Sequence, residues 1–270
     1  MKEFFGFGGY ERVPEGYMSW QHLVFVTSLM IAMIGFAIIA GKQFKNKSYS
    51  EKNKPLIFAA ILINAVEIFK IVMICVRSSD PLGWLYSLPL FLCSIQLIAI
   101  PLAAFTKGRI KEASLDFVSI FGLLGAVLGT YAAGQNYGCY PVISIDNVAS
   151  GITHSISGFA ALYILISGMS SMKRKNICIT FAILFSFCIM AYTANVLLDY
   201  NYMFLVRGDG TPYDIVYNFV GGNPILYPLS VIGLFVIYIT VFYQVYYLVV
   251  GKKAEKAKEC KEEKKPVSVI

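Results

Sequence analysis

The sequence has 270 residues, of which 57% are hydrophobic and 14% charged, and its mean hydropathy is +0.64. A soluble chain of this length carries about 25% charged residues, so the composition excludes one large soluble core and indicates a polytopic membrane protein. The formal net charge of +7 does not indicate nucleic-acid binding, because the basic residues are divided among short segments and a mixed Lys/Glu tail.

Apolar blocks divide most of the chain, and each approaches the roughly 20 residues that an α-helix needs to cross a bilayer. They predict an all-α fold of seven transmembrane helices over Trp20–Ala40, Pro55–Val76, Trp84–Phe105, Ala113–Ala133, Asn147–Met169, Asn176–Leu198 and Pro224–Val250. The first block follows residues of mixed charge and precedes no A-x-A site, so it is interpreted as a membrane helix and not a signal peptide. The expected organisation is an external segment (1–19), a membrane domain (20–250) and a solvated or disordered tail (251–270).

The basic residues indicate an orientation. Most of the 23 Lys and Arg residues follow the first, third and fifth blocks or lie in the C-terminal tail. The excess of Lys and Arg in cytoplasmic loops therefore predicts an external N-terminus and a cytoplasmic C-terminus. We expect a multi-pass protein of the cell membrane, whose inner lysines each gain roughly 1 kcal/mol beside anionic lipid.

Cysteine spacing favours neither a metal site nor a disulfide framework. Cys75 and Cys139 are both expected near the outer side, so one disulfide is conceivable, although free thiols are the prediction. No C-x-x-C spacing is present. We expect no metal and no cofactor.

Polar side chains are expected to collect in the middle and outer part of the bundle, by counting about 1.5 Å of rise per residue. They are Asn64, Glu67, Lys70, Cys93, Gln96, His154, Asn195, Asp199 and Tyr227. Ionisable groups in a membrane cost a few kcal/mol and usually face a bundle interior or a wet cavity. The set therefore predicts a polar cavity open to the outside, whereas the inner half is expected to be nearly featureless. The alternative is an i,i+3 pair of Glu67 with Lys70 plus ordinary interhelical hydrogen bonds.

Two local features predict details of helix packing. Small residues recur at four-residue spacing in the fourth block and favour close helix approach; they include Gly122, Gly125 and Gly129. Pro89 and Pro101 each lack a backbone donor, which would free the carbonyls of Leu85 and Leu97.

The external segment from Asn201 to Gly222 is too apolar for a simple loop. Thr211 followed by Pro212 is typical of an N-cap and first helical position. A short interfacial helix near Pro212–Phe219 is therefore predicted, lying over the cavity as a lid.

Several short motifs resemble a known family. LPLFLC (Leu88–Cys93), the helix of His154, NYMFL (Asn201–Leu205) and the late Tyr227 resemble the YwaF-type seven-helix integral membrane proteins, over roughly residues 15–250. This bacterial group is related to an animal transmembrane acyltransferase that moves acyl chains between phospholipids. The resemblance implies that Cys93 accepts an acyl chain as a thioester while His154 is the general base. It also implies phospholipid or fatty acyl partners, bound by the polar set together with Asn201 and Tyr202.

Two departures from the family pattern leave alternatives open. The bacterial motif reads LPLHLC, with His where this chain has Phe91, and the cysteine of the animal enzyme corresponds to Leu90. The alternative is a non-catalytic lipid-binding or small-solute-binding protein or a transporter. A faint echo between LYSLPL and LYPLSV is compatible with a transporter of two parallel three-helix repeats. A receptor is disfavoured by short inner loops, and a retinal protein by the lack of a lysine in the seventh block. No oligomeric state is predicted.

Overall fold

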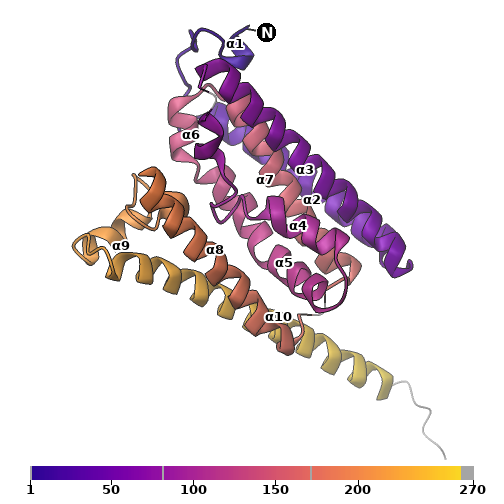
Figure 1. Cartoon of the computed structure of the whole chain (residues 1–270). Helices are drawn as coiled ribbons and strands as arrows, with labels where there is room; N and C mark the ends of the chain where they lie inside the picture. The colour runs from indigo at the N-terminus through magenta and orange to yellow at the C-terminus, as the bar shows by residue number, and fades with distance from the viewer. Residues whose placement is uncertain (1, 81, 171, 263–270) are drawn as a thin grey trace, which may run out of the picture. The chain divides into compact units, whose positions relative to one another are not determined.

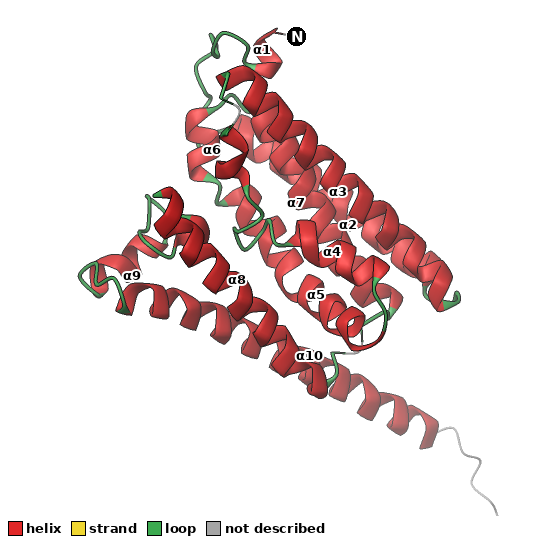
Figure 2. Cartoon of the chain, viewed as in Figure 1, coloured by secondary structure: helices red, strands yellow, loops and turns green. Residues whose placement is uncertain are grey.

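The computed structural model describes residues 2–80, 82–170 and 172–262, whose regular elements are all helical (Figures 1 and 2). Six described helices are long and apolar enough to cross a membrane. These are α2 (Trp20–Phe44), α3 (Tyr49–Ser78), α5 (Gly108–Tyr131), α7 (Ile145–Ser167), α8 (Ile177–Leu198) and α10 (Leu226–Glu262). The all-α polytopic membrane class is therefore confirmed.

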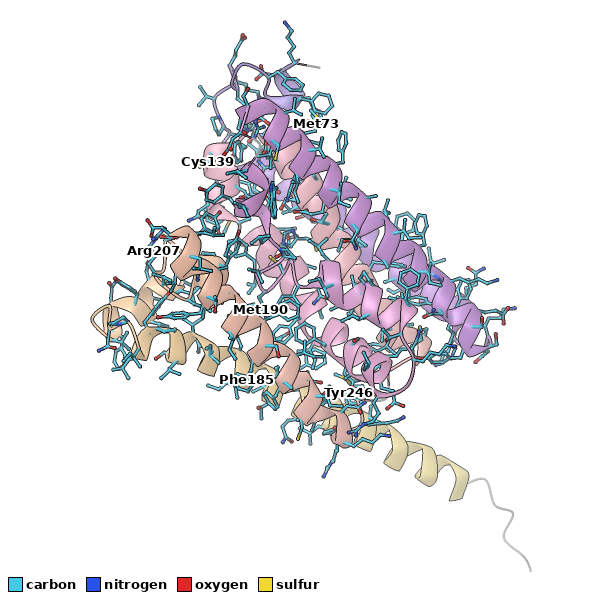
Figure 3. The ribbon with its side chains drawn as sticks, in the orientation of Figure 1. Met73, Cys139, Phe185, Met190, Arg207 and Tyr246 are labelled. Carbon is cyan, nitrogen blue, oxygen red and sulfur yellow. The ribbon has the colours of Figure 1, made fainter. Side chains whose placement is uncertain are left out.

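Shorter helices precede or connect these six. The α-helices are α1 (Lys2–Phe5), α4 (Gln96–Phe105), α6 (Gly134–Cys139) and α9 (Tyr213–Phe219), and the 3₁₀ turns are Gly83–Ser87, Arg174–Asn176 and Tyr202–Phe204. Large apolar side chains are exposed along the long helices, as at Phe185 and Met190 of α8 (Figure 3). Such continuous apolar surface is what lipid-facing helices require.

The prediction of one continuous helix over Trp84–Phe105 is wrong. A 3₁₀ turn ends at Ser87, residues 88–95 form bends and turns, and α4 begins only at Gln96. Pro89 explains the break, because the residue before a proline avoids the helical region. Leu88 is accordingly extended, with φ −59° and ψ 148°.

The chain divides into two compact units, Met1–Val231 and Ile232–Ile270. The first unit contains α1 to α9 and the first turns of α10. The second contains the remainder of α10, which extends beyond its predicted end at Val250 to Glu262. The last eight residues of the predicted tail lie outside the described part of the chain.

Glycines let α5 and α7 approach closely at the centre of the first unit, as the spacing predicted. A Cβ atom at Gly122 would lie 2.8 Å from the Ser157 carbonyl oxygen, and one at Gly158 would lie 2.7 Å from Ala126 Cβ. Around this pair, α2 and α3 pack on α7, and α4 packs on α5 (Figure 1). Close backbone approach is a principal source of helix association in lipid.

Contacts at the helix ends define the path of the chain. Asn53 at the start of α3 accepts a hydrogen bond from Lys111 at the start of α5, whereas Arg77 at the end of α3 pairs with Asp146 at the start of α7. Helices α3 and α5 therefore run in the same direction. The chain between Ser78 and Gly108 returns along the length of the bundle, although only its second half is an α-helix.

A buried ion pair ties the N-terminal segment to one end of the bundle. The Arg77 guanidinium donates to both Asp146 oxygens at 2.7 and 2.9 Å, and Tyr10 donates to the same carboxylate at 2.5 Å. Burial and the neighbouring carboxylate raise the pKa of Tyr10 above its ordinary value. Cys75 and Cys139 are both free.

Candidate functional site

Cys93 lies in the non-helical segment that precedes α4. The Ser94 hydroxyl accepts from the Phe91 N–H at 3.0 Å and donates to the Phe91 carbonyl at 3.1 Å, closing a tight turn. The Gln96 N–H then donates to the Cys93 carbonyl at 3.3 Å. The break in the predicted helix thus places Cys93 next to the N-terminus of α4, where helix dipoles favour a negative charge.

His154 is held on α7 in a defined tautomer. Its Nδ1 lies 2.7 Å from the Ser150 carbonyl oxygen. A carbonyl oxygen can only accept, so Nδ1 carries the proton and Nε2 presents a lone pair. Nε2 is buried and has no hydrogen-bond partner among the described residues. The imidazole is thus arranged as a proton acceptor.

Two glycines of α5 make room for Cys93 and His154. A Cβ atom at Gly129 would lie 2.0 Å from His154 Nε2, and one at Gly125 would lie 3.3 Å from Cys93 Cβ. The thiol lies beside the imidazole, and the two groups interact electrostatically. No hydrogen bond joins the thiol to Nε2, since Nε2 has no partner that meets hydrogen-bond geometry. The structure therefore brings the two predicted catalytic residues together.

Glu67 and Lys70 form the i,i+3 pair that the sequence offered as an alternative. Lys70 Nζ lies 2.6 Å from Glu67 Oε1. The pair also belongs to the surroundings of the thiol and imidazole, because Glu67 interacts electrostatically with Cys93 and Lys70 with His154. Glu67 and Lys70 can therefore both form an ion pair with each other and contribute to the electrostatics around Cys93 and His154.

Gln96 carries a fully buried amide without partners. Its exposed fraction is 0%, and neither Oε1 nor Nε2 has a hydrogen-bond partner among the described residues. The buried hydroxyl of Tyr227 is also unpartnered. Since buried polar groups are nearly always hydrogen-bonded, these groups mark positions where polar atoms of a ligand or water are required.

Two of the motifs behind the family resemblance pack on each other. The ring of Phe91 lies 5.2 Å from that of Tyr202 and 5.8 Å from that of Phe204. The Tyr202 hydroxyl donates to the Leu85 carbonyl. LPLFLC and NYMFL thus form one aromatic contact next to Cys93.

Hydrogen bonds within the protein satisfy the polar groups of Asn64, Asn195 and Tyr202. Asn64 donates to the Leu97 carbonyl at 3.1 Å, and Asn195 both donates to the Tyr202 carbonyl at 3.0 Å and accepts from its N–H at 2.5 Å. The two carbonyls predicted to be freed by prolines, Leu85 and Leu97, are therefore the ones that side chains from distant helices and loops satisfy.

Asp199 and Asn201 lie at the end of α8 and in the following loop. Asp199 is an exposed residue in the left-handed region (φ 49°) that ends the helix. Asn201 donates to the Arg207 carbonyl at 2.7 Å and to Asp209 Oδ2 at 2.8 Å. Both residues shape this connection, and neither has a contact with Cys93 or His154 among those described.

The short helix predicted near Pro212–Phe219 exists as α9, which begins at Tyr213, one residue later than expected. Thr211 Oγ1 accepts from the Tyr213 N–H at 3.3 Å, so it caps the helix from two residues away. The Tyr213 ring stacks on Phe204 at 5.3 Å and interacts electrostatically with Cys93. Burial raises the pKa of Tyr213 to about 12. The start of α9 therefore lies near the thiol.

Buried polar side chains also lie at the end of the bundle where the fourth predicted helix begins, an end that was expected to be nearly featureless. Lys111, Asp116 and Asn176 are at least nine-tenths buried at the end of the bundle where α5 begins. Sequence reasoning missed them because it began the fourth helix at Ala113 and assigned Lys111 to a loop. A signal that could have found Lys111 is its spacing of four residues from Lys107, which is compatible with a helix that begins earlier than Ala113.

Of three comparisons with known proteins, one finds a match. No curated protein and no solved structure shows significant similarity to this chain. A family model described as the TMEM164 family matches residues 17–252, which include all six candidate membrane helices up to the last residues of α10. The chain therefore belongs to the TMEM164 family.

Proposed function

We propose that this protein transfers acyl chains between phospholipids, with Cys93 as nucleophile and His154 as general base. The observation that supports the proposal best is the juxtaposition of the thiol with an imidazole whose Nδ1 is bonded to the Ser150 carbonyl and whose Nε2 is free to accept a proton. A neighbouring base removes the thiol proton and so makes a cysteine a stronger nucleophile at neutral pH. Gly125 packs against Cys93 and Gly129 against His154, and both leave room for these side chains.

The first half-reaction forms a thioester. His154 Nε2 accepts the thiol proton as the sulfur attacks the ester carbonyl of a donor phospholipid. The tetrahedral intermediate collapses by breaking the carbon–oxygen bond of the ester, and the imidazolium returns the proton to the departing lysophospholipid hydroxyl. The acyl chain remains on Cys93.

The second half-reaction reverses these roles. An acceptor lysophospholipid presents its hydroxyl, and His154 removes that proton while the oxygen attacks the thioester carbonyl. The carbon–sulfur bond breaks, and the imidazolium reprotonates the thiolate. The N-terminus of α4 beside Cys93 favours the thiolate as leaving group. The cycle needs no oxidant, reductant or metal.

The membrane topology belongs to the same proposal. We place the N-terminus outside, the C-terminus in the cytoplasm of the cell, and a seventh crossing in the segment between α3 and α5. This placement is supported by the basic loops and by the return of that segment along the bundle. Exposed Cys139 would then react with a membrane-impermeant maleimide in intact cells, and lack of labelling against a Cys139→Ser control would reject the orientation.

The activity is tested by intact-mass analysis of the purified protein after denaturation. We expect an added fatty acyl mass that hydroxylamine removes and that is absent from Cys93→Ser. Cys188→Ser is the matched control, since Cys188 is another free cysteine of the bundle, buried on α8. An acyl mass lost from Cys188→Ser and kept by Cys93→Ser would reject the assignment.

The unpartnered Gln96 amide favours a second candidate function, the binding of a lipid or small solute without chemistry. In that case a ligand would be released on denaturation, no thioester would form, and Gln96→Leu would weaken binding more than Cys93→Ser. The family departures at Leu90 and Phe91 point in the same direction. The same mass experiment separates the two functions, because only a covalent acyl chain survives denaturation.

A further inference from the structure

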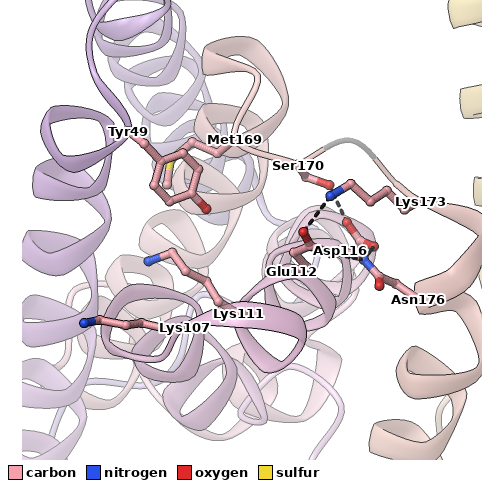
Figure 4. Close-up of a pocket in the computed structure, with 10 residues that line it drawn as sticks. Tyr49, Lys107, Lys111, Glu112, Asp116, Met169, Ser170, Lys173 and Asn176 are labelled. Atoms are coloured by element: carbon pink, nitrogen blue, oxygen red, sulfur yellow. Dashed lines mark hydrogen bonds and ion pairs between the residues drawn. The ribbon is translucent and has the colours of Figure 1, made fainter.

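A pocket lies at the end of the first unit where α5 begins, far from the thiol and imidazole. It has a volume of about 340 Å³ and is formed by the start of α3, the first turns of α5 and the connection between α7 and α8 (Figure 4). This volume is within the range of small-ligand sites. Lys111 and Gly129 are 18 residues apart on α5, which corresponds to roughly 27 Å, so the pocket is separate from the site of the proposed function.

One wall of the pocket is basic. Lys111 is 8% exposed, and its ammonium donates to the Asn53 Oδ1 at 2.8 Å and the Ala104 carbonyl at 3.1 Å, with the Tyr49 ring at 5.5 Å. These partners are neutral, and no described carboxylate lies within ion-pairing distance of Lys111. A buried cation without a counter-ion is costly. Lys107, one turn earlier, lines the same wall (Figure 4).

The backbone adds to this positive wall. Lys107 is the N-cap residue of α5, and no side chain caps the helix there. The first N–H groups of a helix are unsatisfied donors at the positive end of its dipole, and this arrangement binds phosphate in many proteins. The buried Lys111 and the uncapped helix start therefore favour the same kind of ligand, an anion with several acceptor oxygens.

The opposite wall offers hydrogen-bond acceptors. Glu112 is neutralised by Lys173 at 2.5 Å, and Asp116 accepts from Ser170 and from Asn176 Nδ2 at 3.3 Å. Asn176 is 1% exposed, and its Oδ1 has no partner among the described residues. A ligand that fits both walls carries a phosphate for Lys111 and a hydrogen-bond donor for Asn176.

We propose that this pocket binds a phosphate ester that also carries a hydroxyl or ammonium donor. Lys111 and Lys107 hold the phosphate together with the start of α5, and Asn176 accepts from the donor group. A phospholipid headgroup and a free phosphate share the anionic chemistry. The position at the end of membrane helices suits the headgroup, since basic pockets between such helices bind lipid phosphates.

The test uses the full-length protein in detergent, with dihexanoyl phosphatidylglycerol as the first probe and binding measured by thermal shift and native mass spectrometry. Lys111→Met should weaken binding by about tenfold to a hundredfold, the effect of losing a charge-assisted hydrogen bond. Lys107→Met, which changes an exposed residue and leaves the core intact, should weaken binding in the same direction. Lys47→Met is the control for charge, since Lys47 is an exposed lysine outside the pocket.

Two further probes identify the source and the chemistry of the ligand. Inorganic phosphate that displaces phosphatidylglycerol would identify free phosphate as sufficient, whereas phosphate that fails to compete would identify the lipid; either result supports the site. Dihexanoyl phosphatidylcholine, whose headgroup has no donor, should bind about tenfold more weakly, and equal binding would overturn the role of Asn176. The site is overturned if neither phosphatidylglycerol nor phosphate binds, or if Lys47→Met loses as much affinity as Lys111→Met. The thioester experiment reads out Cys93 alone, so the two proposals can fail separately.

Discussion

The replacement Gly129→Ala is the sharpest probe of how the site is built. The new Cβ atom would lie 2.0 Å from His154 Nε2, whereas ordinary contacts begin at 3.4 Å, so the ring or the helix backbone must move by about 1.4 Å. Overpacking of this kind costs about 1–3 kcal/mol. A displacement of about 1 Å at a catalytic group can reduce the rate by about 10²-fold. We therefore expect a thioester yield far below wild type in a protein that still folds.

The readouts are intact mass for the thioester and thermal unfolding in detergent for stability. Gly35→Ala is the matched control, since Gly35 is inside α2 with open space around it, and alanine there should stabilise by about 0.5–1 kcal/mol. In a His154→Ala background, Gly129→Ala should lose most of its cost, because the atoms that it meets are absent. Wild-type thioester yield and an unchanged Tm in Gly129→Ala would refute the placement of the imidazole.

Three other changes test buried polar groups of the first unit. Arg77→Met removes the charged partner of the buried Asp146 carboxylate, to which the Tyr10 hydroxyl still donates, and it should lower stability by about 3–5 kcal/mol. A double variant with Asp146→Leu should recover part of this loss in thermal unfolding, and no recovery would contradict the pairing. Tyr202→Phe removes the hydroxyl that satisfies the Leu85 carbonyl, so the free energy of unfolding should fall by about 1–3 kcal/mol, whereas an unchanged Tm would mean that water satisfies that carbonyl. Gln96→Leu removes a buried amide that has no partner among the described residues, so the ligand-free protein should be at least as stable as wild type. Native mass spectra should show less co-purified lipid. A strongly lowered Tm would reveal a partner of this amide within the protein.

Much of the fold could be predicted because the signals are local. Six of the seven apolar blocks correspond to long helices, since a run of about 20 apolar residues is itself the condition for crossing a bilayer. The short helix after Pro212 was also predictable, because capping depends on residues within one turn. The third block failed because hydropathy measures only apolarity, whereas Pro89 acts on backbone conformation.

The sequence predicts the residues of the site but not how they meet. Local patterns along the chain were enough to predict the membrane class, and they placed a cysteine, a histidine and a glycine repeat in separate blocks. The packing of the helices sets Gly125 of α5 against Cys93 and Gly129 against His154, which leaves both side chains room. It also buries Lys111 with no described carboxylate as a counter-ion. The physical reason is that hydropathy and helical period depend on neighbours along the chain, whereas the meeting of helix faces depends on the packing of side chains far apart in it.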